Sequence, residues 1–168
     1  LPDFPRPLVI SKVTTSFKKE DELFATGLQY LNKGDLASAQ SRLSDAYHRN
    51  PLTLEFALAY AEVLFRRSDF KAAKEVLLPF AGRPDPPGDL LSLLGRVCHN
   101  LGQFAEALTY YTSYLARFGA NIDILNYTGM CYFQTGKKDE AIKAWQKSLE
   151  LSPNQDKIRG LLDSLKKK

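Results

Sequence analysis

The side chains best suited to catalysis are few in this sequence, and they do not form a recognisable constellation. The histidines are His48 and His99, and the cysteines are Cys98 and Cys131. The sequence contains no glycine-rich phosphate loop, no Cys/His cluster with metal-ligand spacing and no nucleophile elbow. Both cysteines fall among apolar positions, which favours buried free thiols and requires no disulfide. We therefore expect a protein that is not an enzyme and that binds no cofactor and no metal ion.

A row of carboxylates recurs every 34 residues near the predicted starts of helices. Its members are Asp21, Glu55, Asp89 and Asp123. Negative charge is favourable at these places because the first turn of a helix carries the positive end of the helix dipole. The same row would also form an acidic rim for basic peptides. The sequence leaves both interpretations open.

The period of 34 residues extends to the positions that must hold the helices together. Small residues recur where paired helices cross closely, a turn residue recurs where the first helix ends, and a bulky residue fills the gap. The small residues are Gly27, Ala61, Gly95 and Gly129 on first helices, and Ala39, Ala73, Ala107 and Ala141 on second helices. The turn residues are Gly34, Ser68, Gly102 and Gly136, and the bulky residues are Leu43, Leu77, Tyr111 and Trp145. Each period predicts a helix, a tight turn and an antiparallel helix.

This order of small, turn and bulky positions, closed by Pro51 and Pro153 in two of the periods, resembles the tetratricopeptide repeat (TPR) family. The resemblance covers about residues 20–155 and implies four tandem repeats, at about 20–53, 54–87, 88–121 and 122–155. It implies an all-α fold, a right-handed α-α superhelix or TPR solenoid. Apolar residues at helical spacing after Pro153 predict a capping helix at about 156–168.

The N-terminal segment does not follow the repeat. Pro2, Pro5 and Pro7 disfavour a helix, and a β-prone apolar run follows over residues 8–13. We expect a short extended arm or linker at 1–15 and a single TPR domain at 16–168, with Thr15 or Ser16 capping its first helix. Docking of the arm in this chain's own groove and self-association through the arm both stay open.

Within the second repeat, Pro79 falls inside the predicted second helix. Proline removes a backbone hydrogen bond and clashes with the preceding turn, so the position predicts a kink or an end of that helix.

In the TPR family the first helices line a concave surface that holds a segment of a partner protein. The resemblance therefore implies a peptide-binding groove on the first helices of this chain. Tyr30, Leu64, Cys98 and Tyr132 on the first helices are expected to fill the core. An apolar row one residue past them should turn toward that groove, although its side chains could instead pack between repeats. This row consists of Leu31, Phe65, His99 and Phe133. The predicted groove residues are Phe24, Leu28, Leu31, Leu58, Phe65, Arg66, Arg96, His99, Asn100, Asn126, Tyr127, Met130 and Phe133.

Some members of the family bind the C-terminal carboxylates of chaperones with a clamp of lysine, arginine and asparagine. In this sequence Phe24, Leu28 and Ala59 stand at corresponding places, and Asp89 stands where a cation is expected. We therefore do not expect that type of ligand.

The distribution of charge argues against a nucleic-acid partner. The net charge is +4, but residues 1–19 and 156–168 each carry +3, which leaves −2 on the repeats. A mildly acidic body with basic ends is a poor electrostatic footprint for DNA or RNA. No stretch approaches the roughly 18 apolar residues of a membrane span. The chain begins at Leu1 rather than Met, and we expect a soluble domain of a longer protein whose compartment the sequence leaves open.

These observations predict a non-catalytic protein-protein interaction module that binds a partner peptide or segment in its groove. The partner is a protein or peptide whose identity is not encoded in these patterns. The alternative is a structural spacer or assembly domain whose groove is filled by its own N-terminal arm or by a neighbouring copy.

Overall fold

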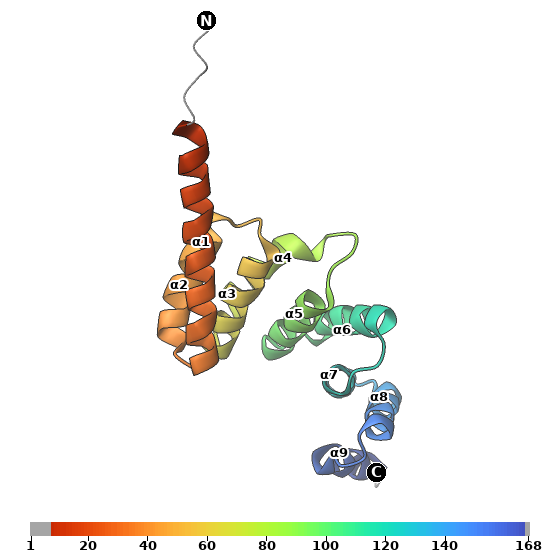
Figure 1. Ribbon diagram of the computed structural model, residues 1–168. Coiled ribbons are helices and arrows are strands. Elements are labelled where there is room, and N and C mark those ends of the chain that lie inside the picture. The colour runs from red at the N-terminus through yellow and green to blue at the C-terminus, as the bar shows by residue number, and fades with distance from the viewer. Residues whose placement is uncertain (1–7, 167–168) are drawn as a thin grey trace, which may run out of the picture. The chain divides into compact units, whose positions relative to one another are not determined.

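The computed structural model describes residues 8–166, and it describes the side chains of residues 19–165. This range contains nine α-helices and no strand (Figure 1). The helices are α1 (Leu8–Lys33), α2 (Leu36–Arg49), α3 (Leu54–Arg66), α4 (Phe70–Ala81), α5 (Gly88–Asn100), α6 (Phe104–Phe118), α7 (Ile122–Gln134), α8 (Lys138–Leu151) and α9 (Asp156–Lys166). The prediction of an all-α chain is confirmed.

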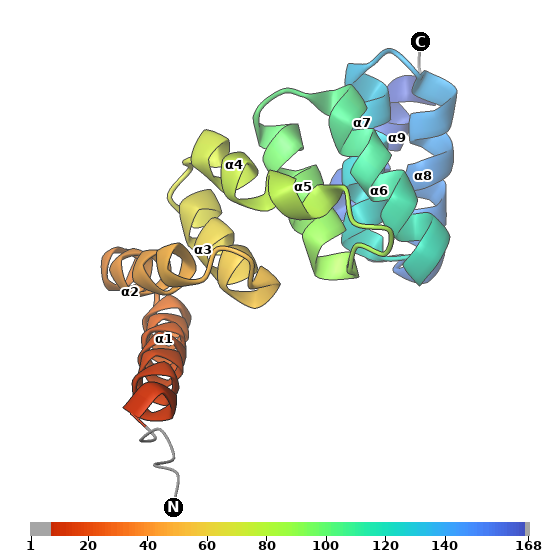
Figure 2. The same ribbon diagram turned by 90° about the horizontal axis from the view of Figure 1, so that it is seen from above.

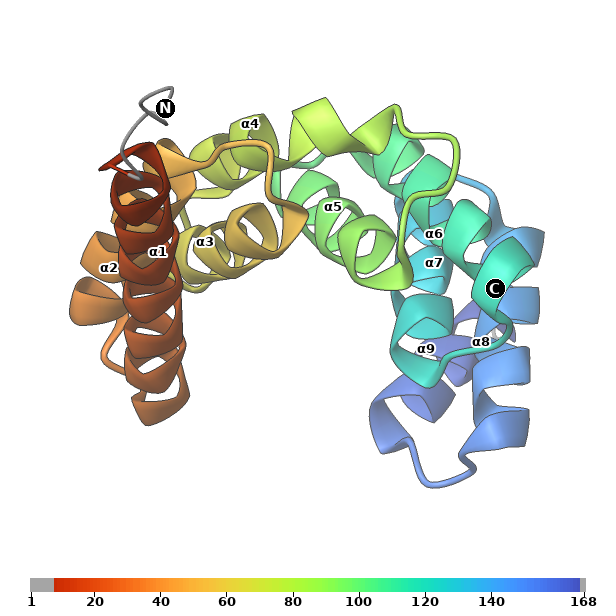
Figure 3. The same ribbon diagram turned by 45° about the horizontal axis from the view of Figure 1, so that its top comes forward.

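The chain divides after Asp69 into two compact units, which are described separately. Unit 1 contains α1, α2 and α3. In it α1 packs along α2 and also contacts α3 (Figure 3). Its buried apolar cluster joins residues of all three helices, including Leu31, Leu43 and Val63.

Unit 2 contains α4 to α9 (Figure 2). Helices that follow one another in sequence pack against one another, and the first helices α5 and α7 also touch directly. One buried cluster lies between α5, α6 and α7 and includes Cys98, Tyr111 and Ile124. A second cluster joins α8 to α9 through Trp145, Ile158 and Leu162. The apolar face of α9 therefore covers α8, as a capping helix requires.

The turns between paired helices share one backbone conformation. Gly34, Gly102 and Gly136 have φ values of 80°, 74° and 79°, and Ser68 has 64°. Only glycine adopts this left-handed conformation without a steric penalty, and for other residues the penalty is roughly 1 kcal/mol. The four turn positions of the 34-residue period are therefore confirmed, including the one that holds serine.

The bulky positions of the second helices pack onto the glycines of the first helices. A Cβ atom added at Gly95 would collide with the ring of Tyr111, and one added at Gly129 would collide with the ring of Trp145. Both rings are fully buried. In unit 1 Leu43 lies against Gly27 in the same way. The absence of a side chain at these glycines therefore lets the two helices of each pair approach closely.

The expected extended arm is wrong for residues 8–15, which form the first two turns of α1. Pro7 is the last proline before α1 in the sequence and the next is Pro51, so no proline falls within the residues of this helix. The β-propensity of residues such as Val9 is too weak to resist a helix that is favoured further along the chain. Thr15 and Ser16 consequently lie inside the helix and do not cap it. The proline-rich part of the expected arm lies outside the described residues.

Pro79 lies inside α4, and the helix ends two residues later, at Ala81. The proline loses its backbone hydrogen bond to the carbonyl of Glu75, and only two helical residues follow it. The following loop is held by Arg117 of α6, which pairs with Asp85 and donates a hydrogen bond to the carbonyl of Pro86.

The contact between Gly129 and Trp145 gives a stability prediction. Gly129→Ala should lower the free energy of unfolding by about 1–3 kcal/mol, because the added methyl group overpacks a buried site. Gly160→Ala is the matched control in α9, where an added Cβ meets no atom within 4 Å. It should raise stability by about 0.5–1 kcal/mol through its higher helix propensity. Urea unfolding of both variants measures the difference, and equal effects would contradict the packing argument.

Candidate functional site

The predicted groove residues of unit 1 lie mostly against its core. Phe24 and Leu28 are half-buried and pack on the apolar cluster. The ring of Phe24 also contacts that of Phe56, with 4.8 Å between the ring centroids. Leu31 is only 7% exposed and belongs to that cluster. Leu31 therefore follows the alternative expected for its row, in which the side chains pack between repeats.

The remaining predicted residues of unit 1 lie on α3. Leu58 and Phe65 are half-buried, whereas Arg66 is exposed. Arg66 forms an ion pair with Glu62 one turn earlier, with 2.8 Å between Nε and Oε1. A role of Leu58, Phe65 and Arg66 in binding stays a prediction.

Unit 2 brings four of the predicted residues together in a pocket of about 430 Å³. These residues are His99 from α5 and Asn126, Tyr127 and Met130 from α7. The spacing of Asn126, Tyr127 and Met130 places these three residues on one face of α7. The rest of the lining is Asp123, Gln155, Asp156, Lys157, Ile158 and Leu161.

A second pocket of about 380 Å³ adjoins the first, because Asp123 and Tyr127 line both. It adds Arg96 from α5 and Tyr114 from α6 to the site, together with Ser92, Asn121 and Ile124. We call the two pockets together the unit 2 groove. Its floor is formed by α5 and α7, which are the first helices of their pairs.

One wall of the groove was not predicted, because it comes from α9 and from the residue that precedes it. Gln155 accepts a hydrogen bond from Asn126 Nδ2 at 2.7 Å and donates to the backbone oxygens of Ser148 and Ser152. It thereby fixes α9 beside α7. The sequence signalled the apolar face of α9, with Ile158 and Leu161, but carried no signal for the role of Gln155.

The polar groups of α7 are tied to the core beneath them. The indole Nε1 of Trp145 donates to the backbone oxygen of Asn126 at 3.2 Å. The ring of Tyr127 stacks on that of buried Tyr111, with 5.8 Å between centroids. The Oδ1 atom of Asn126 is buried and receives no hydrogen bond from any residue that the structure describes.

Two predicted residues of unit 2 lie outside both pockets. Asn100 is exposed, and its Nδ2 donates to the backbone oxygen of Arg96 at 2.8 Å, so it closes the end of its own helix. Phe133 is 37% exposed and its ring lies 6.2 Å from that of Trp145. The apolar row is therefore not continuous along the groove.

His99 and Cys131 form the one arrangement in the described part of unit 2 that resembles a catalytic pair. His99 Nδ1 lies 3.3 Å from Cys131 Sγ, and both cysteines are buried free thiols, as predicted. Burial raises the pKa of Cys131 to about 11 and that of Cys98 to about 12. Burial also lowers the pKa of His99 below its ordinary value of 6.5. The pair is therefore a neutral thiol beside a neutral imidazole, which lacks the thiolate that nucleophilic attack requires.

Across the side chains at residues 19–165, no group of three or more His, Cys, Asp and Glu is placed to hold a metal ion. None of the helices found between residues 8 and 166 combines the length and the apolar character needed to cross a bilayer.

The acidic row is explained in part by helix geometry. Glu55, Asp89 and Asp123 lie in the first turns of α3, α5 and α7, where the helix dipole favours them. Asp21 lies in the middle of α1, because that helix begins at Leu8, so the dipole does not account for it.

The lowered pKa of His99 makes stability depend on pH. Protonation is favoured more in the unfolded chain than in the folded one, so the stability present above about pH 6.5 should fall as the pH drops. The slope for one proton is at most about 1.4 kcal/mol per pH unit. Urea unfolding between about pH 7.5 and about pH 5.5 should show this loss, and His99→Gln should remove it. His48→Gln on the exposed face of α2 is the control, and an equal effect of both variants would contradict the assignment.

Comparisons with known proteins agree with this architecture. The tetratricopeptide repeat family matches residues 24–85, 88–117 and 122–155. A TPR repeat-containing protein of Methanocaldococcus jannaschii is 27% identical over 133 residues, which are 79% of this chain and 23% of that relative. The chain thus spans about a quarter of the length of the curated relative that it matches.

Solved structures show the same fold at low sequence identity. MamA from Desulfovibrio magneticus RS-1 has a TM-score of 0.73 and 18% identity, and the match covers 82% of this chain and 77% of that one. A TPR protein from Parabacteroides merdae has a TM-score of 0.71 and 21% identity, with 84% and 57% covered. The helix pairs, the turn positions and these matches together lead to one assignment. The chain belongs to the tetratricopeptide repeat family.

Proposed function

We propose that this chain is a non-catalytic interaction module that binds a segment of a partner protein in the unit 2 groove. The observation that carries the proposal is the pair of adjoining pockets along α5 and α7, which share Asp123 and Tyr127. Pockets of this size accept a few side chains of a peptide.

The composition of the groove supports recognition rather than catalysis. Met130, Ile158 and Leu161 offer apolar surface, and Tyr127 offers an aromatic ring held in place by Tyr111. Such rigid aromatic and apolar groups commonly provide most of the binding free energy at interfaces. The neutral pair of His99 and Cys131 supplies no nucleophile.

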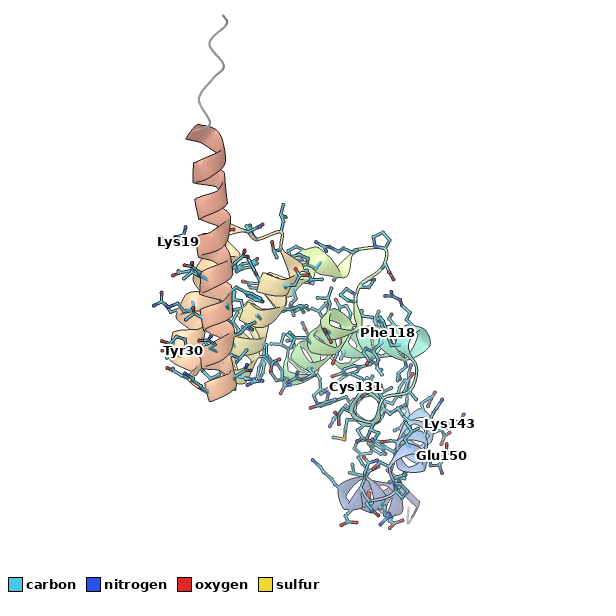
Figure 4. The ribbon with its side chains drawn as sticks, in the orientation of Figure 1. Lys19, Tyr30, Phe118, Cys131, Lys143 and Glu150 are labelled. Carbon is cyan, nitrogen blue, oxygen red and sulfur yellow. The ribbon has the colours of Figure 1, made fainter. Side chains whose placement is uncertain are left out.

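Partner capture with matched variants tests the proposal. Tyr127→Ala combined with Met130→Ala removes an aromatic and an apolar side chain of the groove, and should weaken binding by roughly tenfold or more. The control is Lys143→Ala with Glu150→Ala, because both residues are exposed on the outer side of α8 (Figure 4). Immobilised wild type and the control should retain the same proteins from an extract of the source cells, and the groove variant should lose them.

Circular dichroism and urea unfolding establish that all three proteins are folded at the binding temperature. If the folded groove variant and the wild type capture the same partners equally, the groove is not the binding surface. A role as a spacer or assembly domain, the alternative stated from the sequence, would then take its place.

A further inference from the structure

The charged side chains of the unit 2 groove do not select a ligand by its charge. The two pockets are lined by Asp123, Asp156, Lys157 and Arg96, so two carboxylates stand beside two cations. Asp156 already pairs with Arg159 at 3.5 Å. The uncharged groups of the groove must therefore distinguish one peptide from another.

Two tyrosines line the smaller pocket, and other rings hold both of them in place. Tyr127 of α7 stacks on buried Tyr111, with 5.8 Å between centroids, and its ring lies 5.4 Å from that of His99. Tyr114 of α6 packs against Phe118, with 5.3 Å between centroids. Both tyrosines are half-buried. The pocket of about 380 Å³ thus has aromatic walls on two helices, each fixed before a ligand arrives.

The smaller pocket also contains hydrogen-bond donors that the described part of the chain leaves unused. Among the residues that the structure describes, none is hydrogen-bonded to the hydroxyl of Tyr114, Tyr127 or Ser92. The Oδ1 atom of Asn121 accepts from the backbone N–H of Ile124 at 3.1 Å. The amide Nδ2 group of Asn121 has no partner among the described residues, and is a further donor. A ligand that complements this pocket should offer acceptors and apolar rings.

A proline-rich segment presents these groups. Proline has no backbone N–H, so the carbonyl groups of such a segment outnumber its donors. The segment adopts the extended polyproline II conformation without internal hydrogen bonds, which leaves the carbonyls available. Its prolyl rings pack in grooves lined by aromatic side chains. Because the conformation is formed before binding, little conformational entropy is lost on docking.

We propose that the unit 2 groove binds a proline-rich segment of a partner protein in the polyproline II conformation. A prolyl ring packs between Tyr114 and Tyr127, whose hydroxyl groups donate to carbonyl oxygens of the segment. Apolar residues that flank the prolines occupy the larger pocket, against Met130, Ile158 and Leu161. This inference rests on the proposed function and specifies the chemistry of the partner segment.

Selection of random linear peptides displayed on phage tests this chemistry without presupposing the ligand. The whole chain serves as bait, and the variant Tyr127→Ala with Met130→Ala serves as bait for counter-selection. Peptides enriched only on the wild type should contain prolines at a spacing of about three residues, which is one turn of the polyproline II helix.

Variants that remove single hydroxyl groups then test the assigned tyrosines with a selected peptide. Tyr114→Phe and Tyr127→Phe keep the rings and remove one donor each, so each should weaken binding by roughly twofold to tenfold. Tyr132→Phe is the matched control, because Tyr132 also lies on α7 and lines neither pocket of the groove. Replacing a proline of the peptide by alanine adds a backbone N–H and should also weaken binding.

The balance of charges in the groove gives a second expectation. The affinity for the selected peptide should change by less than about twofold between about 0.05 M and about 0.5 M salt, because screening acts on both signs of charge alike. A steep loss of affinity with added salt would show that charge selects the ligand, and would overturn the proposal.

Residues 1–7 of this chain are a competing occupant, because they contain Pro2, Pro5 and Pro7. A variant that lacks residues 1–7 should bind the selected peptide with the affinity of the wild type. Tighter binding by this variant would show that the chain's own segment occupies the groove, and would overturn the proposal of a separate partner.

The remaining outcomes separate this inference from the proposed function. Peptides that depend on the groove but lack proline would overturn the polyproline preference and leave the groove as a binding site. Proline-rich peptides that bind Tyr114→Phe, Tyr127→Phe and Tyr132→Phe equally well would overturn the assigned hydroxyl contacts. Met130 is the single methionine and lines the larger pocket, so its methyl NMR signal reports occupancy. Peptides that bind wild type and the groove variant equally, without shifting that signal, would overturn both proposals.

Discussion

The fit of a second-helix side chain onto a first-helix glycine is the constraint on which the rest of unit 2 depends. Tyr111 and Trp145 occupy space that any side chain at Gly95 or Gly129 would fill. Because the rings lie there, Trp145 reaches the backbone of Asn126 and Tyr111 supports Tyr127 from below. The floor of the groove is therefore positioned by the same contacts that hold the helix pairs together. A change in the core of unit 2 would therefore shift the residues that line the groove.

The features that could be predicted from sequence are those that a local constraint determines. A left-handed turn needs glycine or a tolerated substitute, so Gly34, Ser68, Gly102 and Gly136 marked the turns correctly. The start of α1 could not be predicted from its β-prone residues, because intrinsic propensity is a weak force beside helix continuation. The groove was predicted only in part, because the same repeat position is buried as Leu31 and exposed as Phe133. Its α9 wall depends on contacts of Gln155 that leave no trace in a periodic pattern.

The interior of unit 2 contains reactive side-chain types in unreactive states. Cys98, Cys131 and Tyr111 lie where burial opposes their charged forms, and burial raises the pKa of each. Burial likewise disfavours the protonated form of His99 and lowers its pKa. Neutral groups of this kind stabilise the core through packing. Charged side chains line the groove instead, namely Asp123, Asp156, Lys157 and Arg96.

Helix α9 meets α8 through the positions that α7 uses to meet α6. Ile158 and Leu162 stand 34 residues after Ile124 and Thr128, and all four side chains are buried. Ile124 packs beside Tyr111, and Ile158 packs beside Trp145 at the equivalent place. A duplication of one period ahead of Gln155 would therefore place matching surfaces on both sides of the insertion. Proteins of this architecture can thus acquire a longer recognition surface in whole repeats, without redesigning a core that already exists.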